Sequence, residues 1–234
     1  MSNSSQQGHA VVTGSSGGIG KAICEDLLGA GWRVTGLDLS PPTITHNSFV
    51  HHRLDLSGQV QTRSIASILA DVDALVHAAG VLRVAPLGKL DVEAGELMWQ
   101  IHVGAASQLA DLLVPAMVER GFGRVVFIGS RVAQGLPGRG QYAATKAAVI
   151  ALARSWAVEV APKGVTVNVV SPGATATPML KDPARAGSAP RVPPIGRLVE
   201  PQEIASMVAY LLSPAAAAIT GQNFNICGGS SLSQ

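Results

Sequence analysis

Short apolar runs, rich in β-branched residues, alternate with longer amphipathic stretches along this chain. Runs of this length that do not alternate with polar residues are typical of strands buried on both faces. They predict strands at Ala10–Val12, Arg33–Leu37, Phe49–Leu54, Ala74–His77, Arg124–Ile128, Val165–Val170 and Asn223–Ile226. Helical spacing of apolar residues predicts helices over Ile19–Ala30, Val60–Ala70, Val92–Arg120, Gln141–Val160 and Gln202–Leu212.

This alternation of strands and helices predicts an α/β fold, with a parallel sheet covered by helices on both faces. No internal repeat and no dividing linker interrupts it, so we expect residues 1–234 to form a single domain. The polar residues 1–8 are expected to be a flexible N-terminus.

Two segments break the alternation of strands and helices. Between Asp38 and Phe49 there is no room for a full crossover helix. Residues 178–195 are rich in Pro, Gly and Ala with scattered Lys and Arg, a composition that favours a loop over a packed element. Because long loops in compact domains are often functional, we expect residues 178–195 to cover a substrate.

Composition restricts the class of protein. The chain is 47% hydrophobic and 14% charged, which is enough for a large core. A net charge of +2 without a basic run favours neither nucleic acid nor a membrane surface. No apolar run of about 18 residues and no signal peptide are recognised. Two cysteines far apart, Cys24 and Cys227, indicate neither a disulfide framework nor a metal site, and they fit a cytoplasmic location.

The first predicted strand–helix junction is rich in glycine. Gly14, Gly18 and Gly20 follow the strand and open the helix. Glycines at such a turn allow a pyrophosphate to approach the backbone closely, and the helix N-terminus supplies N–H groups and partial positive charge. A glycine-rich turn can also serve packing alone, but its position here favours a dinucleotide site.

Two carboxylates follow the next predicted strands. Asp38 ends the second strand, where it can accept hydrogen bonds from the adenosine ribose and would repel a 2′-phosphate. With no basic residue at Ser15 or Ser16, this indicates NAD rather than NADP, although Asp38 alone could simply begin a turn. Asp55 ends the third strand and could contact the adenine edge or cap the following helix.

A hydroxyl, a phenol and an ammonium group are clustered later in the chain. Ser130 follows the fifth predicted strand, and Tyr142 and Lys146 lie four apart at the start of a helix, on one face. A lysine cation near a tyrosine favours the phenolate, so the pair could perform acid–base chemistry near neutral pH. A Tyr-x-x-x-Lys pair alone is common by chance. The dinucleotide site predicted earlier in the chain favours a catalytic role for the pair here.

Together these motifs resemble the short-chain dehydrogenase/reductase family over essentially the whole length. The matching residues are Thr13-Gly14-x-x-x-Gly18-Ile19-Gly20, His77-Ala78-Ala79-Gly80, Ser130, Tyr142, Lys146, Pro172-Gly173, Thr175 to Thr177, Gly196-Arg197, Pro201 to Ala205 and Gly228-Gly229. The resemblance implies a Rossmann-type doubly wound parallel sheet of about seven strands in three α/β/α layers. It also implies cofactor contacts from Gly14, Ser16, Gly18, Ile19, Gly20, Asp38, Asp55, Ala79, Gly80, Tyr142, Lys146, Pro172, Gly173, Thr175 and Thr177.

The resemblance also implies a mechanism and an assembly. Ser130, Tyr142 and Lys146 would be catalytic, with hydride transfer between NAD, or NADP less favourably, and a small secondary alcohol or ketone. No metal is implied. Small apolar residues along Val92–Arg120 and Gln141–Val160, with the family resemblance, predict a homotetramer.

The chain departs from the family pattern at two histidines. His102 stands where the family has its fourth catalytic residue, an Asn that helps to hold a water, and His77 replaces the first Asn of the Asn-Ala-Ala-Gly motif. His102 is therefore assigned to the catalytic set with altered geometry. A dinucleotide-binding sensor with little or no catalysis remains the alternative class.

The substrate is less constrained by the sequence. The short loop after Asp38 is similar to that of dehydrogenases acting on dihydrodiol acids such as 2,3-dihydro-2,3-dihydroxybenzoate, and Arg131 or Arg139 could meet a carboxylate or simply be solvated. A 3-oxoacyl-carrier reductase is the other enzymatic alternative, which the NAD preference disfavours.

Overall fold

The structure, a computed structural model, describes residues 8–58, 64–65, 69, 71–181 and 191–232. Seven parallel strands form one sheet in the order β3-β2-β1-β4-β5-β6-β7. The strands are β1 (His9–Thr13), β2 (Arg33–Asp38), β3 (Phe49–Arg53), β4 (Ala74–His77), β5 (Gly123–Ile128), β6 (Val165–Pro172) and β7 (Asn223–Ile226). The predicted α/β class and the doubly wound parallel sheet are confirmed.

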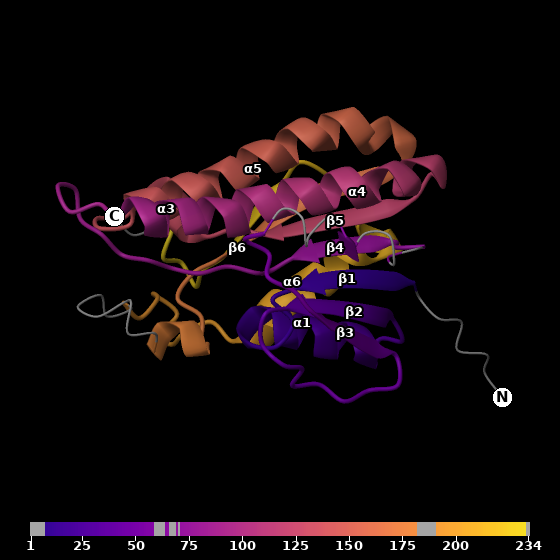
Figure 1. The fold of residues 1–234 in the computed structure, drawn as a ribbon, viewed down its shortest axis with the longest axis horizontal. Coiled ribbons are helices and arrows are strands. Elements are labelled where there is room, and N and C mark those ends of the chain that lie inside the picture. The colour runs from indigo at the N-terminus through magenta and orange to yellow at the C-terminus, as the bar shows by residue number, and fades with distance from the viewer. Residues whose placement is uncertain (1–7, 59–63, 66–68, 70, 182–190, 233–234) are drawn as a thin grey trace.

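Helices cover both faces of the sheet (Figure 1). The main helices are α1 (Gly18–Gly29), α3 (Val92–Trp99), α4 (Ala105–Glu119), α5 (Gly140–Val160) and α6 (Pro201–Leu212), with short 3-10 turns η2 (Arg131–Gln134), η3 (Ala161–Lys163), η4 (Pro178–Lys181) and η6 (Pro214–Ala216). One core cluster joins α4 and α5 to the sheet, and the second joins α1 and α6 to its other face.

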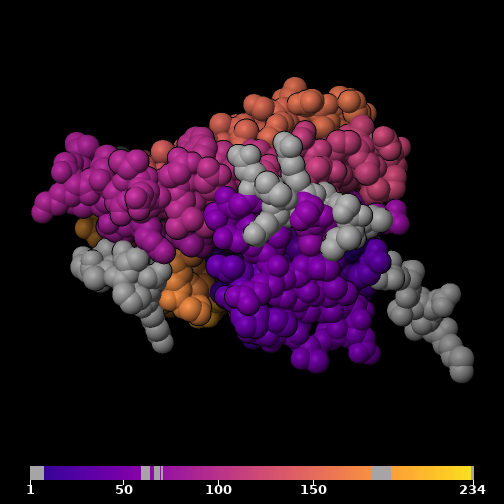
Figure 2. Space-filling model, viewed as in Figure 1, coloured from indigo at the N-terminus to yellow at the C-terminus, as the bar shows by residue number. Residues whose placement is uncertain are grey.

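Buried strand residues explain this arrangement. Strands β4, β5 and β6 are buried along their whole length, so their side chains pack against both helical layers. In the space-filling view, the violet residues around β2 and β3 lie below the magenta and orange residues of the α3–α5 layer (Figure 2). The strand order reverses between β1 and β4, and open α/β sheets bind ligands in the crevice at such a point.

The two predicted breaks in the alternation can be compared with the structure. No helix lies between β2 and β3: residues 39–48 form a described loop, as expected. Of the predicted helix Val60–Ala70, only Ser64, Ile65 and Leu69 are described, and residues 1–7 and 182–190 also lie outside the described residues. The predictions for these segments therefore stay predictions.

The predicted helix Val92–Arg120 is not regular. A π-helical turn, Gln100–Gly104, separates α3 from α4. Such turns are frequent at functional sites. Within the described residues, Val92–Arg120 is also long and apolar enough to cross a membrane by length and composition alone. Core helices pass the same test, and α4 buries six side chains against the sheet, so composition is weak evidence for a span.

Candidate active site

A cleft of about 1100 Å³ lies at the carboxyl ends of the strands. It is lined by the glycine-rich turn after β1, the segments after β4, β5 and β6, the start of α5 and part of residues 191–194. The sequence-predicted site residues that line it are Gly14, Ser16, Gly18, Ile19, Gly20, Asp38, Ala79, Gly80, Ser130, Tyr142, Lys146, Pro172, Gly173, Thr175 and Thr177. His102 and Asp55 do not belong to the lining, so the structure brings the rest together without them.

The glycine-rich turn is shaped by its backbone. Gly14 has a φ of 69°, and a Cβ there would lie 2.9 Å from the backbone nitrogen of Ala79, so only glycine lets these segments approach so closely. Gly17 precedes α1 without a side-chain cap, and the first turn of α1 carries no acidic residue. The N–H groups of this helix end are therefore suited to an anion such as a pyrophosphate.

Thr177 closes this anion-binding turn from the opposite side. A Cβ on Gly18 would lie 3.4 Å from the Thr177 side chain, which shows how close the segment after β6 comes to α1. Gly17, in contrast, has open space where a Cβ would stand. The glycines and the uncapped helix end fit the pyrophosphate of a dinucleotide.

Asp38 is held in place by two backbone donors at one end of the cleft. Its Oδ2 accepts a hydrogen bond from Ser16 N at 2.9 Å, and its Oδ1 accepts one from Ser40 N at 2.8 Å. The loop that follows is tied to the glycine-rich turn, since Thr43 donates to the Ser16 carbonyl at 2.9 Å. A carboxylate fixed in this way is suited to accept from the hydroxyls of a ribose.

Asp55 lies outside this end of the cleft. Its Oδ1 accepts hydrogen bonds from both the backbone nitrogen and the hydroxyl of Ser57, at 2.9 and 2.7 Å. These contacts stabilise the turn after β3. Most of the helix that Asp55 was alternatively expected to cap lies outside the described residues, so that alternative also stays a prediction. The adenine contact stays a prediction.

Ser130, Tyr142 and Lys146 gather at the other end of the cleft. Ser130 ends the chain segment after β5, and its Oγ accepts a hydrogen bond from Val132 N at 3.1 Å. Lys146 is 4% exposed, and its Nζ donates to the Ile128 carbonyl at 2.7 Å and lies 5.9 Å from the centre of the Tyr142 ring. Burial lowers the pKa of Lys146 to about 8. The ammonium is thus charged at neutral pH but close to its titration.

His102 lies beneath the cleft, in the π-helical turn. Its Nε2 accepts a hydrogen bond from Val81 N at 3.1 Å, which places the ring proton on Nδ1. Nδ1 donates to the Thr145 hydroxyl at 2.8 Å, and that hydroxyl donates to the Tyr142 carbonyl at 2.8 Å. The ring also meets the Tyr142 ring edge-on, with centroids 5.5 Å apart. Both nitrogens are occupied, and His102 orients the start of α5 from outside the residues that line the cleft.

His77 links the π-helical turn to the glycine-rich turn after β1. Its Nε2 donates to the Ile101 carbonyl at 3.0 Å, which leaves Nδ1 to accept from the Thr13 hydroxyl at 3.0 Å. The Thr13 oxygen in turn accepts from the backbone nitrogens of Ala78 and Ala79. His77 therefore fixes the π-helical turn relative to the glycine-rich turn.

Both buried histidines are neutral. Burial first, and then the charge of Lys146, lower the pKa of His77 to about 3. The same two causes lower the pKa of His102 well below its usual value. Lys146 is consequently the one cation in this buried group, and the histidines act only through their hydrogen bonds.

Comparison with known proteins gives a consistent result. A family profile described as enoyl-(acyl carrier protein) reductase matches residues 14–231. The 3-oxoacyl-[acyl-carrier-protein] reductase FabG of Vibrio cholerae is 37% identical over 240 residues, which cover 94% of this chain and 96% of the relative. The chain belongs to the short-chain dehydrogenase/reductase family. It is thus an NAD(P)-dependent oxidoreductase of the kind that acts on CH–OH groups.

Solved structures agree with this assignment. A short chain dehydrogenase/reductase family protein is similar with a TM-score of 0.87 and 32% identity, covering 97% of this chain and 98% of the other. The ligand-free aldohexose dehydrogenase of Thermoplasma acidophilum is similar with a TM-score of 0.90 and 26% identity, covering 98% of this chain and 96% of the other. The family fold is shared although these proteins have differently named activities.

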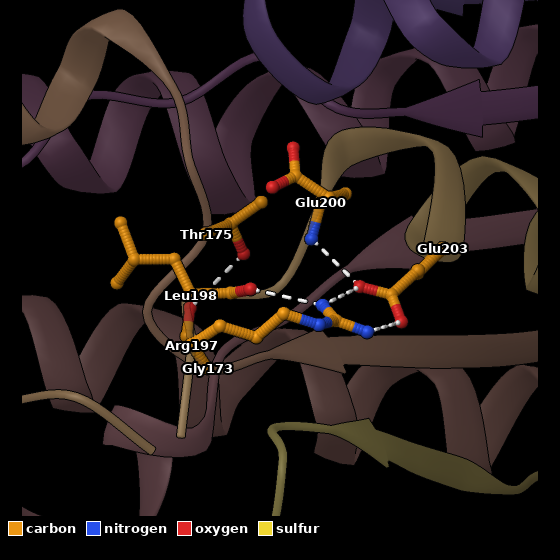
Figure 3. A network of polar contacts seen from close by, with 6 residues as sticks. All are labelled: Gly173, Thr175, Arg197, Leu198, Glu200 and Glu203. Atoms are coloured by element: carbon orange, nitrogen blue, oxygen red, sulfur yellow. Dashed lines mark hydrogen bonds and ion pairs between the residues drawn. The ribbon is translucent and has the colours of Figure 1, made fainter. Parts of the chain in front are cut away.

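In this short-chain dehydrogenase/reductase, the chain just after the predicted covering segment, residues 178–195, is held by hydrogen bonds and an ion pair. Val199 pairs with the chain after β6, donating to Ala174 O and accepting from Ala176 N, both at 2.9 Å. Beside it, the Arg197 guanidinium reaches both carboxylate oxygens of Glu203 at 2.7 and 2.9 Å (Figure 3). Glu203 also accepts from Glu200 N at 2.8 Å, so this contact joins the segment to the start of α6.

Sequence reasoning missed some residues that hold the site. Thr145 and Val81 fix His102, and the Ile128 carbonyl fixes Lys146, but none of these was singled out. Thr145 lies one residue before Lys146, which is a weak signal; its partner is 43 residues away and could not be inferred from spacing.

Proposed function

We propose that this chain is an NAD-dependent dehydrogenase/reductase of a small secondary alcohol or ketone, with Tyr142 as the acid–base group. The observation that carries the proposal is that Tyr142 and the buried Lys146 face the same cleft as the glycine-rich turn and Asp38. When bound, the nicotinamide cofactor supplies hydride chemistry. The residues of the chain bind it, orient the substrate and move the proton.

Three residues of the chain serve the proton transfer. Tyr142 takes the proton of the substrate hydroxyl during oxidation and returns it during reduction. Ser130, fixed by Val132 N, donates a hydrogen bond to the substrate oxygen. Lys146, held against Ile128 O, stabilises the Tyr142 phenolate electrostatically and binds the nicotinamide ribose.

His102 is assigned a positioning role in this proposal. Its two hydrogen bonds hold Val81 and, through Thr145, the backbone of Tyr142. A Cβ on Gly80 would lie 3.0 Å from His102 Nε2 and 3.7 Å from Lys146 Nζ, so the segment after β4 packs closely against both groups. The ring thus supports the geometry of Tyr142 and Lys146 without moving a proton.

The preference for NAD over NADP rests on the adenosine end. Asp38 is the one acidic residue among the described residues that line the cleft, and Ser16, Gly17 and Ser40 beside it are uncharged. A 2′-phosphate placed there would face a fixed carboxylate. Arg53, the strand partner of Asp38, donates to the Leu39 carbonyl at 2.9 Å and does not line the cleft. NADP remains a weaker alternative.

The proposal is tested by titrating the protein with NAD, NADH, NADP and NADPH by calorimetry, and by screening secondary alcohols and ketones with both cofactors. We expect tighter NAD(H) binding and turnover of at least one secondary alcohol. Binding without any turnover would favour the dinucleotide sensor, and equal or tighter NADP(H) binding would remove the cofactor assignment.

A second candidate is a 3-oxoacyl-carrier reductase. Its support is the 37% identity to proteins of that name over 94% of this chain. Reduction of a 3-oxoacyl thioester much faster than of small ketones would favour it over the dehydrogenase of a free alcohol, and the same screen includes that substrate.

We also propose a cytoplasmic homotetramer. Apolar side chains are exposed on the outer layer, among them Trp99 of α3, Leu112 of α4 and Val158 of α5, which is 80% exposed. Burying such a surface against a second copy would be favourable. Light scattering at micromolar concentration is expected to give four times the chain mass, and a monomer would contradict this.

A further inference from the structure

The charges that line the cleft are unevenly distributed. Asp38, at the adenosine end, is the one acidic side chain among the described lining residues. Four cations line the cleft elsewhere: Lys146, Arg131, Arg139 and Arg191. Low-dielectric walls concentrate the field of such groups, so the substrate end of the cleft attracts anions.

Arg131 and Arg139 lie closest in sequence to the groups that would hold the substrate oxygen. Arg131 follows Ser130 directly in η2, and Arg139 precedes α5 three residues before Tyr142. Both side chains are half-buried. The segment between them therefore connects Ser130 to Tyr142, and both arginines belong to the wall of the same cleft.

Arg131 is held on that wall by one contact. Its Nη1 donates to the Ser230 carbonyl at 3.3 Å, and Ser230 itself lines the cleft. A guanidinium has five N–H donors, and a carboxylate needs two of them for a bidentate pair. The contact with Ser230 thus fixes the side chain while leaving donors for a ligand.

The cofactor does not account for these arginines. Its anionic group, the pyrophosphate, fits the N-terminus of α1 directly after β1. Arg131 and Arg139 instead follow β5, which is separated from β1 by β4. Two strand spacings correspond to about 10 Å. The arginines are thus placed for the second ligand of the cleft.

We propose that the substrate is a small hydroxy or oxo acid, whose carboxylate is bound by Arg131 and Arg139. This rests on the function proposed above. In oxidation, the C–H bond of the carbinol carbon breaks with hydride transfer to NAD⁺, the hydroxyl proton passes to Tyr142, and a C=O bond forms. The carboxylate takes no part in the bond changes; its pairing with the arginines orients the carbinol carbon. The products are the oxo acid and NADH.

The test compares matched substrates. Secondary hydroxy acids, their methyl esters, and corresponding phosphate esters are assayed with NAD on the intact protein. We expect the acids to exceed their methyl esters in kcat/KM by at least about tenfold, since a charge-assisted hydrogen bond contributes roughly 1.5–3 kcal/mol, or about 10–100-fold. Arg131→Gln and Arg139→Gln should each raise KM for the acid and lose most of the discrimination between acid and ester.

Arg33→Gln is the matched control, because Arg33 is exposed at the start of β2 and does not line the cleft. It should retain the full discrimination. A second measurement does not depend on turnover: calorimetric binding of a non-reactive carboxylate analogue to the NADH-loaded protein should weaken about tenfold or more in Arg131→Gln and Arg139→Gln, but not in Arg33→Gln.

These readouts separate the two proposals. Turnover of esters as efficient as that of acids, or faster turnover of phosphate esters or carrier-linked thioesters, would overturn the carboxylate subsite and leave the dehydrogenase intact. Arginine-dependent binding of the analogue without turnover of any substrate would support the subsite and contradict the proposed function. Binding of the analogue unchanged in both arginine variants would overturn the subsite.

Discussion

The two ends of the cleft differ in charge and in how they are built. At the adenosine end, one carboxylate, Asp38, is fixed by backbone N–H groups, and its neighbours are glycines and serines. At the substrate end, Lys146 is buried and Arg131 and Arg139 line the wall. None of the described residues that line this end is acidic. One cleft can thus repel an anion at one end and attract an anion at the other.

The largest effect is expected from a substitution at the substrate end, Lys146→Met. Lys146→Met keeps most of the length of this buried side chain and removes its charge, so we expect folding to be retained. Turnover should fall by about 10²–10⁴-fold, because stabilisation of the Tyr142 phenolate is lost, and NAD binding should weaken as well. Steady-state kinetics and calorimetry measure the two effects.

Lys163→Met, an exposed change in η3, is the control for Lys146→Met and should leave both quantities unchanged. If Lys146→Met turned over substrate within a few-fold of the wild type, the ammonium would have no part in the chemistry.

The next change tests the adenosine end. Asp38→Ala removes the carboxylate that would accept from the ribose and repel a 2′-phosphate. The ratio of the NADP(H) to the NAD(H) dissociation constant should shrink by roughly 10–100-fold, as expected for one charge-assisted contact. Calorimetric titration with both cofactors measures the ratio. Asp26→Ala, an exposed change in α1, should leave it unaltered; an unaltered ratio in Asp38→Ala would rule out the role of this carboxylate.

The third prediction uses the two neutral histidines beneath the substrate end. Burial lowers the pKa of His77 to about 3 and that of His102 well below its usual value. Between about pH 3 and pH 6.5 the unfolded chain therefore binds more protons, so stability is fully present above about pH 6.5 and is lost as the pH falls. The slope should approach about 1.4 kcal/mol per pH unit for each histidine.

Urea unfolding at several pH values measures this slope. His77→Asn should make it shallower, whereas His46→Asn, at an exposed residue of the loop after β2, should not. A wild-type stability that stayed constant from pH 6.5 to pH 4.5 would contradict the account of the buried neutral histidines.

The smallest effect is expected at His102. The amide of an Asn there would end near the position of His102 Nδ1 and could keep the contact with the Thr145 hydroxyl, so we expect His102→Asn to retain activity within a few-fold or to raise it. His102→Ala removes the contacts with both Val81 N and the buried Thr145 hydroxyl and should cost about 1–3 kcal/mol of stability. Unfolding and kinetic measurements on the pair decide this; a large loss of turnover in a stable His102→Asn protein would show that the ring itself is needed.

The ends of the cleft also differ in how far the sequence predicts them. Strand–helix alternation, the glycine-rich turn and Asp38 are local patterns, and the structure places them as predicted, with β4 and β7 at their predicted bounds. The place of Asp38 at the end of β2 follows from this local information, whereas the order of the strands in the sheet was not predicted and is known from the structure.

The support of the substrate end was not predictable in the same way. The π-helical turn depends on contacts such as that of His77 with Ile101, 24 residues away, and propensity alone indicated an unbroken helix. Likewise, the pairing of His102 with Thr145 spans 43 residues. Such contacts arise from packing of the folded chain, so spacing in the sequence could name Ser130, Tyr142 and Lys146 but not what holds them.

The central claim is that Tyr142 performs the acid–base chemistry, and Tyr142→Phe tests it most directly. This change removes one hydroxyl and keeps the ring that packs on His102. The rate of NADH formation with a substrate that the wild type oxidises should fall by about 10²–10⁴-fold or more, while NAD binding, measured by calorimetry on the same preparation, should barely change. A Tyr142→Phe protein that forms NADH within a few-fold of the wild-type rate would contradict the account.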